Sequence, residues 1–460
     1  MHEIRDHARK EGAWMNRDFS KGTIWKITLS QALPLMLAQL VQLLYNVVDR
    51  IFIGHMDGEN SMALTGVGLT FPVITFIVSF AALFGIGGVP LFSIANGAGD
   101  KQRAERIMGT SCALLLISSA VLTITGYIFC KPILYLLGAS DSSCVYAFDY
   151  LKFYLIGTVF SMLTTGLNSY ISAQGFPRTG MLTTMIGAVL NIILDPIFIF
   201  VLKLGISGAA TATVISQVVS AVWILRFLTK KAALPLRREN IRIDGGIAKN
   251  ICRLGTSNFV MSGTACIVQA ACNATLQTFG GDIYVGIMTV LNSVRDVFFL
   301  PISGLVNGAQ PVMSYNYGAK KYDRVRQSIR FNTLAGAVYT ISAWLTIVIF
   351  PGFWFRIFSK DAALIAPGID AIKIYFFGFV FMSFQFAGQS TFQALGDAGH
   401  AIFFSLLRKV IIVIPLTLIL PRVGMGVTGV FIAEPISNMI GGLASYITMR
   451  LTVYNKLKKE

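Results

Sequence analysis

The chain has 460 residues, of which 54% are hydrophobic and only 13% are charged. Because soluble proteins carry roughly twice that share of charged side chains, the composition excludes a soluble enzyme. The net charge of +16 would also suit a nucleic-acid-binding protein, but the basic residues are grouped in short tracts between long apolar runs, which is typical of a membrane protein. We therefore expect a chain embedded in the lipid bilayer, with no nucleic-acid partner.

The apolar runs are long enough to cross about 30 Å of hydrocarbon as helices, which takes roughly 20 residues each. They show no alternation of apolar and polar residues of the kind that barrel strands have, so the sequence predicts an all-α polytopic membrane protein. About twelve runs follow one another along the chain: Ile24–Gly54, Met62–Asn96, Ile107–Cys130, Tyr146–Ala173, Met181–Leu202, Gly208–Phe227, Ile251–Phe279, Tyr284–Met313, Ser328–Ile349, Ile369–Leu395, Ala401–Leu420 and Thr428–Val453.

The basic residues between the runs predict the orientation. If the runs cross alternately, about 29 of the 38 Lys and Arg lie on one side of the membrane. This side is expected to be the cytoplasm, with both chain ends there, and the membrane to be the bacterial plasma membrane. The segment before Ile24 is polar, so a cleaved signal peptide is not expected. The six cysteines have no CxxC spacing, which indicates neither a zinc site nor a redox pair.

The chain also resembles itself at an offset of 221 residues. Matched positions include Gly87 and Gly308, Pro90 and Pro311, Lys152 and Lys373, Gly157 and Gly378, and Gly208 and Gly429. Two copies of a six-helix unit start from the same side of the membrane, so they are expected to be related by an axis near the membrane normal. We predict an N-terminal lobe at residues 1–228, a cytoplasmic linker at 229–246 and a C-terminal lobe at 247–460.

Two acidic residues lie inside apolar runs of the first half, Asp49 and Asp195. An ionisable group there is costly unless it is paired or hydrated, so each is a functional candidate. Asn191 precedes Asp195 by four residues and shares its helical face, and Pro196 frees a backbone carbonyl nearby; the alternative is a structural polar staple between helices. For Asp49 the alternative is a helix-end ion pair with Arg50. Further polar candidates for this site are Gln42, Asn46, Thr213 and Asn168.

The second half carries two more acidic residues in its apolar runs, Asp296 and Glu434. Asp296 follows Arg295 directly, so a structural ion pair is favoured over a functional role. Glu434 has no evident partner in the sequence, and both roles stay open. Arg408 and Lys409 are interpreted as lying at the inner end of a span, where contact with anionic lipid headgroups is favoured over contact with an anionic substrate.

Several of these segments together resemble the multidrug and toxin extrusion (MATE) family, which belongs to a superfamily that also contains lipid-linked oligosaccharide flippases. The resemblance runs from Ile24 to Arg450 and is greatest to the bacterial branch that includes MepA and DinF. It rests on LPLMLAQLVQLLYNVVDRIFIG, NGAGDKQRAERI, SAQGFPRTG, NIILDPIFIF, LGISGAATATVISQ and QPVMSYNYGAKKYDRVRQ.

The resemblance implies a two-lobe antiporter that exports cationic or amphipathic drugs and other toxic organic compounds in exchange for H⁺ or Na⁺. It implies a cation site in the first lobe, formed by Asp49, Asn191, Asp195, Thr213 and Asn168. The second lobe departs from the branch typified by NorM, which has a glutamate in the seventh helix. The seventh run of this chain has no acid, and its only strongly polar side chains are Gln269 and Asn273.

From these observations we hypothesise that Asp49 and Asp195 share a buried site that takes up H⁺ or Na⁺ from outside and releases it inside. The two lobes would rock between outward and inward openings. No metal is expected beyond Na⁺ at Asp49, Asn191 and Asp195, and no cofactor is expected. The chain has no GxxxxGK[ST] motif for ATP, and it is expected to act as a monomer.

Two other functions are alternatives to export. A lipid or lipid-linked oligosaccharide flippase of the same superfamily would be expected to hold a pyrophosphate with cations in its cavity, and this chain has few Lys or Arg in mid-span. A membrane-embedded transferase would need clustered acids to hold Mg²⁺ and diphosphate. Asn191 and Asp195 are one acid short of such a pair, so export is the favoured function.

Overall fold

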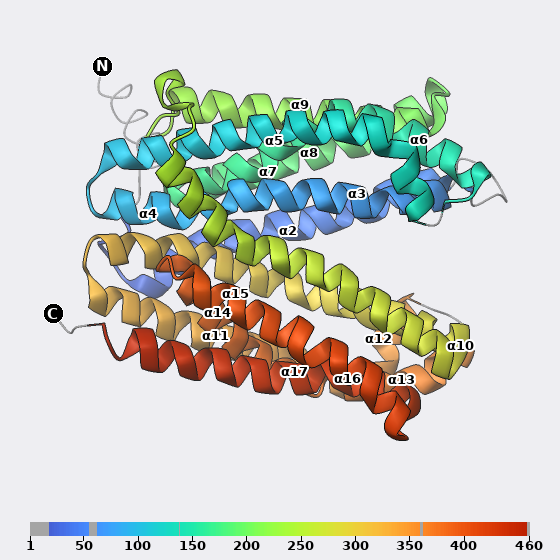
Figure 1. Ribbon diagram of the computed structural model, residues 1–460. Coiled ribbons are helices and arrows are strands. Elements are labelled where there is room, and N and C mark those ends of the chain that lie inside the picture. Colours follow the sequence, from blue (N-terminus) through green and yellow to red (C-terminus); the bar gives the residue numbers. More distant parts are fainter. Residues whose placement is uncertain (1–17, 55–61, 138, 359–361, 458–460) are drawn as a thin grey trace, which may run out of the picture. The chain divides into compact units, whose positions relative to one another are not determined.

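The computed structural model describes residues 18–54, 62–137, 139–358 and 362–457, and every regular element in these ranges is a helix (Figure 1). Ten helical segments of the described chain are long and apolar enough to cross a membrane. One of them, α10 (Gly245–Gly318), bends at Gly281, where φ is 71°, and so provides two crossings. Another crossing is divided between α6 (Asp141–Ile156) and α7 (Thr158–Ala173), each too short alone. The predicted all-α polytopic membrane fold is confirmed.

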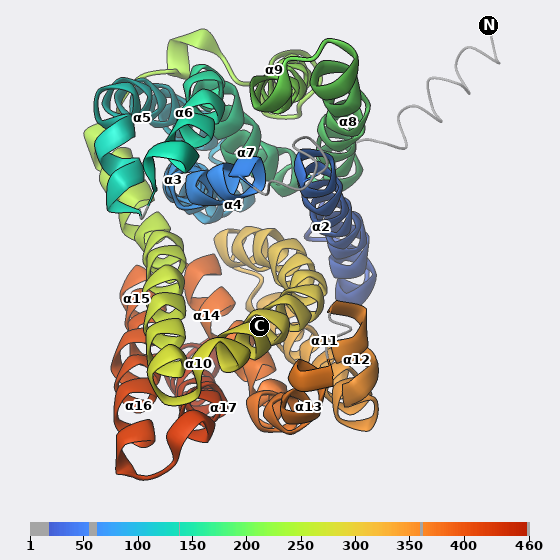
Figure 2. The same ribbon diagram turned by 90° about the vertical axis from the view of Figure 1, so that its right-hand side faces the viewer.

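The first of two compact units comprises Leu33–Gly255 and the short stretch that ends at Lys21. Its core contains Phe92, Met108 and Tyr170, all with 0% exposure, and the Tyr170 hydroxyl is satisfied by Ser111 Oγ at 2.6 Å. Helix α8 packs on α9, α3 on α6, and α7 on both α5 and α9 (Figure 2). The helices are α2 (Ile24–Gly54), α3 (Met62–Phe84), α4 (Val89–Gly97), α5 (Lys101–Leu136), α6, α7, α8 (Pro177–Pro196) and α9 (Gly205–Lys230).

The second unit comprises Thr256–Glu460 and the stretch Gly22–Ala32, which includes the first residues of α2. Its core contains Phe355, Phe376 and Leu291, which are at most 1% exposed. Helix α14 packs on α17 and α11, and α13 also packs on α17. The elements are α10 from residue 256 onward, α11 (Tyr322–Ile349), α12 (Pro351–Phe358), α13 (Ala362–Phe376), α14 (Met382–Ala394), α15 (Ala398–Leu406), the π-helical segment η6 (Leu407–Val413), α16 (Ile414–Ile419) and α17 (Gly426–Met449).

The boundaries of the helices recur at the offset of 221 residues. Helices α5 and α11 begin at Lys101 and Tyr322, α8 and α15 at Pro177 and Ala398, and α9 and α17 at Gly205 and Gly426. The backbone recurs as well, because φ is 88° at Gly175 and 84° at Gly396, in the left-handed region that glycine adopts readily. The repeat in the sequence therefore reflects one helical unit that is built twice.

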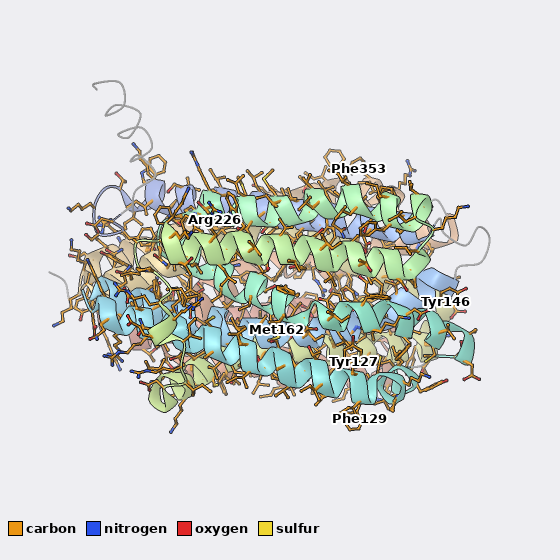
Figure 3. All side chains as sticks on the ribbon, turned by 90° about the horizontal axis from the view of Figure 1, so that it is seen from above. Tyr127, Phe129, Tyr146, Met162, Arg226 and Phe353 are labelled. Carbon is orange, nitrogen blue, oxygen red and sulfur yellow. The ribbon has the colours of Figure 1, made fainter. Side chains whose placement is uncertain are left out.

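Large apolar side chains cover the outside of both units. Phe129 of α5 is 53% exposed and Phe353 of α12 is 59% exposed, and both project away from the ribbon (Figure 3). Exposure of so many bulky apolar side chains would drive aggregation in water, whereas lipid tails solvate them. The outer surface therefore agrees with insertion in a bilayer.

The connection between α9 and α10 is docked on the first unit rather than free. Glu105 of α5 receives a hydrogen bond from Asn240 at 3.3 Å and lies 3.4 Å from Arg237 Nε. The side-chain oxygen of Gln174 accepts the backbone N–H of Leu234 at 2.8 Å. Residues 234–242 thus follow a defined path along the end of the first unit.

Candidate functional site

The first cluster of predicted site residues is formed where α8 ends. Pro196 has no backbone N–H, so it cannot continue the α-helical hydrogen-bond ladder, and the chain passes into a π-helical segment at Ile197–Val201. Asn191 and Asp195 lie one turn apart on the inner face of α8 and are 2% and 0% exposed. Local helix geometry therefore presents a buried amide and a buried carboxyl group to the same place.

Hydrogen bonds join three helices at this point. Asn191 Nδ2 donates to Asp195 Oδ1 and to Thr213 Oγ1 of α9, both at 3.2 Å. The carboxyl group of Asp195 also lies close to that of Asp49 on α2. The structure thus brings together Asp49, Asn191, Asp195 and Thr213.

Tyrosine side chains enclose the carboxyl pair. Tyr150 of α6 is 4% exposed and lies near Thr213, and the rings of Tyr150 and Tyr154 stack with centroids 6.2 Å apart. Tyr45 of α2 is partly buried and lies close enough to interact electrostatically with both carboxyl groups. Sequence reasoning missed these tyrosines, although Tyr45 lies one helical turn before Asp49 on the same face.

Oxygen atoms at this cluster could hold a small cation. Asn191 Oδ1 is buried and accepts no hydrogen bond from the described residues, and Asp195 Oδ2 accepts none from a described amide, hydroxyl or ammonium donor. Carboxylate and amide oxygens are suitable ligands for a hard cation and equally for a proton. The donor set therefore fits either H⁺ or Na⁺.

Not every predicted residue lies in this cluster. Asn168 of α7 donates a side-chain hydrogen bond to the Gly180 carbonyl at 3.2 Å. Gly180 lies roughly 22 Å from Asp195 along α8, at 1.5 Å per residue. Gln42 is partly buried on α2, two turns before Asp49. The side chains of Asn46 and Arg50 lie outside the described residues, although the backbone of both is helical.

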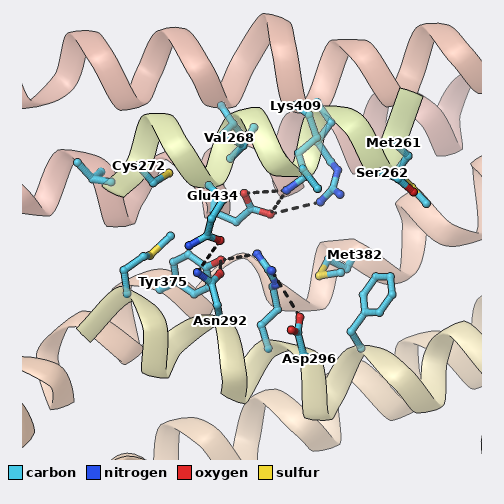
Figure 4. Close-up of a pocket in the computed structure, with 18 residues that line it drawn as sticks. Met261, Ser262, Val268, Cys272, Asn292, Asp296, Tyr375, Met382, Lys409 and Glu434 are labelled. Atoms are coloured by element: carbon cyan, nitrogen blue, oxygen red, sulfur yellow. Dashed lines mark hydrogen bonds and ion pairs between the residues drawn. The ribbon is translucent and has the colours of Figure 1, made fainter. Parts of the chain in front are cut away.

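A second cluster lies in the second unit, around a cavity of about 290 Å³. The π-helical segment η6 directs two consecutive cations into the interior, where Arg408 is 8% and Lys409 is 7% exposed. Lys409 Nζ donates to both Glu434 carboxylate oxygens, at 2.9 and 3.2 Å (Figure 4). Arg408 Nη1 lies 3.5 Å from the same carboxylate and donates to Asn438 Oδ1 at 2.8 Å. Glu434 thus has two cationic partners.

The interpretation of Arg408 and Lys409 as headgroup ligands is wrong. Arg408 follows the start of its span, Ala398, by ten residues, which is roughly 15 Å along a helix and half the hydrocarbon thickness. Their depth in the apolar run was the signal that could have placed them correctly. Side chains at this depth turn toward the protein interior because the lipid core cannot solvate them.

The opposite wall of the cavity is formed by α10. Arg295 Nη1 donates to the Tyr375 hydroxyl at 3.0 Å, and Arg295 Nη2 lies 3.4 Å from Asp296 Oδ1. Asn292 donates a hydrogen bond to Gln269 Oε1 at 2.9 Å. Gln269, one of the two strongly polar residues of the seventh run, thus lines this cavity. The charged lining residues are three cations and two carboxylates: Arg295, Arg408, Lys409, Asp296 and Glu434.

Comparison with known proteins decides the family. A family model described as MatE matches residues 34–197 and 259–419. The chain belongs to the MATE family. MATE proteins are transporters and not enzymes, and the predicted resemblance is confirmed.

Curated MATE relatives match over nearly the whole chain. The multidrug export protein MepA of Staphylococcus haemolyticus is 28% identical over 444 residues, which cover 95% of this chain and 96% of the relative. MepA of Staphylococcus aureus is 26% identical over 443 residues, with the same coverage of 95% and 96%. A solved MATE structure, described as the outward-facing conformation of a multidrug resistance transporter, superimposes with a TM-score of 0.89 at 25% identity and covers 95% of this chain and 98% of that one.

Proposed function

We propose that this MATE protein is a cation-coupled antiporter of the bacterial plasma membrane that exports amphipathic drugs and other toxic organic compounds. The observation that carries the proposal is the proximity of the Asp49 and Asp195 carboxyl groups in the first unit. The names of the MepA relatives, from 26 to 28% identical, support multidrug export. The distribution of basic residues supports a cytoplasmic location for both termini.

The carboxyl pair can couple an ion to substrate movement. Two carboxylates in contact repel each other, so the pair favours a bound H⁺ or Na⁺ wherever that ion is abundant. Each proton that moves down about 100 mV supplies roughly 2.3 kcal/mol, enough for about a fiftyfold concentration ratio. Binding and release of the ion would then bias a rocker-switch exchange between outward and inward openings. One chain contains both units, so a monomer suffices for this cycle.

The experiment is efflux of a cationic dye from cells that express Asp49→Asn or Asp195→Asn at the wild-type level. Both variants should lose most of the efflux, because an amide cannot take up the ion. Asp149→Asn is the matched control, since Asp149 pairs with Lys152 at 2.6 Å and its side chain is 36% exposed. Efflux at the wild-type rate in both variants of the pair would refute the proposal. Vesicles with an imposed pH or Na⁺ gradient would identify the coupling ion.

A flippase for lipids or lipid-linked oligosaccharides is the second candidate function. A flippase would need cations in its cavity, and Arg295, Arg408 and Lys409 all line the cavity of the second unit. A flippase would move a fluorescent phospholipid between leaflets of proteoliposomes without a cation gradient. Drug export with no such lipid movement would exclude it.

A further inference from the structure

The cavity of the second unit has a positive charge, which export of cationic drugs does not explain. Glu434 interacts electrostatically with Lys409, Arg408 and Arg295, so one carboxylate faces three cations. Asp296 does not correct this balance, because its side chain is 60% exposed and its ion-pair partner among the described residues is Arg295. The inner part of the cavity therefore has an excess of positive charge.

The positions of the cations make this excess costly. Arg408 and Lys409 lie near the middle of the span Ala398–Val423, where a charged group has no lipid or water to solvate it. Arg408 makes its shorter hydrogen bond to a neutral group, Asn438, at 2.8 Å, and is 3.5 Å from Glu434. Even with the Arg295–Asp296 pair counted, three cations face two carboxylates, which leaves a net positive charge that another anion can neutralise.

The shape of the cavity specifies what kind of anion fits. At about 290 Å³ it approaches the size of a small-molecule pocket. Its charged end is formed by residues of α10, η6 and α17, and much of its remaining lining is apolar (Figure 4). The apolar lining includes Met261, Met288, Met382, Phe299 and Val430. Methionine and aromatic side chains adapt to many apolar groups, so the cavity suits an amphipathic molecule whose anionic end meets the cations.

We propose that this cavity binds the anionic group, a carboxylate or a phosphate, of an amphipathic molecule at Arg408, Lys409 and Arg295. The bound anion takes hydrogen bonds that Lys409 otherwise gives to Glu434. The proposal rests on the proposed export function in one respect, namely that the bound molecule is a transport substrate. Zwitterionic and anionic amphiphiles, and not only cations, are then substrates.

The test measures binding by the purified full-length protein in phosphatidylcholine nanodiscs. Rhodamine 110 has a free carboxylate, and rhodamine 123 is its methyl ester, so the two dyes differ only at the group in question. Fluorescence polarisation gives the Kd of each. We expect Arg408→Met and Lys409→Met to weaken binding of rhodamine 110 at least tenfold and to change binding of rhodamine 123 less than twofold.

Two variants separate the role of charge from that of folding. Lys409→Arg keeps the positive charge and should restore binding of rhodamine 110 to within threefold of wild type. Arg356→Met, which removes an exposed cation on α12, should leave both affinities unchanged. The proposal would be overturned if Lys409→Met weakened binding of both dyes equally. It would also be overturned if Lys409→Met did not change the ratio of the two Kd values.

A further arm distinguishes the source of the anion. Phosphatidylglycerol added to the nanodiscs should displace rhodamine 110 if the site takes the headgroup of an anionic lipid, and should leave its Kd unchanged if it takes a soluble substrate. Both results support an anion site. Because binding is measured without a gradient, its outcome is independent of the efflux test on Asp49 and Asp195.

Discussion

Thr213 of α9 and Glu434 of α17 occupy the same position in the two halves of the repeat, 221 residues apart. Thr213 accepts a hydrogen bond from Asn191, whose amide also bonds Asp195, whereas Glu434 binds Lys409 and Arg408. One helical framework therefore carries a pair of carboxyl groups in its first copy and a group of cations in its second. The two units are alike in backbone, but cations accompany a carboxylate in the second and not in the described cluster of the first.

Thr213→Val should weaken coupling without removing it. Valine has the same shape but cannot accept the hydrogen bond from Asn191, and a hydrogen bond of this kind contributes about 1 kcal/mol, or roughly a fivefold change in an equilibrium constant. We expect the concentration of H⁺ or Na⁺ that gives half-maximal efflux in vesicles to rise about fivefold. Thr213→Ser is the control and should behave as wild type. An unchanged ion dependence in Thr213→Val would place the threonine outside the site.

Glu434→Ala should destabilise the second unit. Removal of the carboxylate leaves Arg408 and Lys409 buried without it, and breaking a buried ion pair in this way costs about 3–5 kcal/mol. Thermal unfolding in detergent should show a clearly lower Tm, and Lys409→Met in the same chain should recover part of the loss. Asp149→Ala breaks an exposed pair and should cost at most about 1 kcal/mol. A wild-type Tm in Glu434→Ala would show that the pair contributes no stability.

Gly378→Ala should be more harmful than Gly157→Ala, although the two glycines are equivalent in the repeat. A Cβ atom at Gly378 would lie 2.6 Å from the Pro435 carbonyl oxygen, which is backbone and cannot move aside. At Gly157 it would lie 2.6 Å from a methyl group of Val214, which can rotate. We expect a loss of about 1–3 kcal/mol at Gly378 and less at Gly157, measured by denaturation in detergent.

Gly263→Ala is the matched control for this pair, because nothing lies within 4 Å of a Cβ atom there. It should stabilise the helix by up to about 1 kcal/mol, since alanine is the better helix former. Equal effects at Gly378 and Gly157 would contradict the packing described.

Glu105→Gln should release the connection between α9 and α10. The carboxylate of Glu105 lies 3.4 Å from Arg237 and accepts a hydrogen bond from Asn240, and glutamine has no charge to attract the arginine. Trypsin should cut the connection, which contains Arg237, Arg238 and Arg242, about fivefold faster if roughly 1 kcal/mol is lost. Glu239→Gln is the control, because Glu239 pairs with Arg237 at 3.5 Å within the connection itself, so its loss does not detach the connection from α5. Equal cleavage rates in both variants and wild type would show that the connection is held by other contacts.

Features that depend on neighbours along the chain could be predicted from the sequence. Apolar runs of membrane-spanning length predicted the helices, and matches at the offset of 221 residues predicted the repeat that the helix boundaries confirm. The contact between Asn191 and Asp195 was also predictable, because residues four apart on a helix always share a face.

Contacts between side chains on different helices could not be predicted in this way. Asp49 lies beside Asp195 although 146 residues separate them, and Asn168, on a helix next to α8, bonds instead with a distant turn of α8. Arg408 and Lys409 face Glu434 because η6 and α17 pack with these faces together. The rotation of each helix about its own axis determines such contacts, and that rotation depends on the packing of all its neighbours rather than on local spacing.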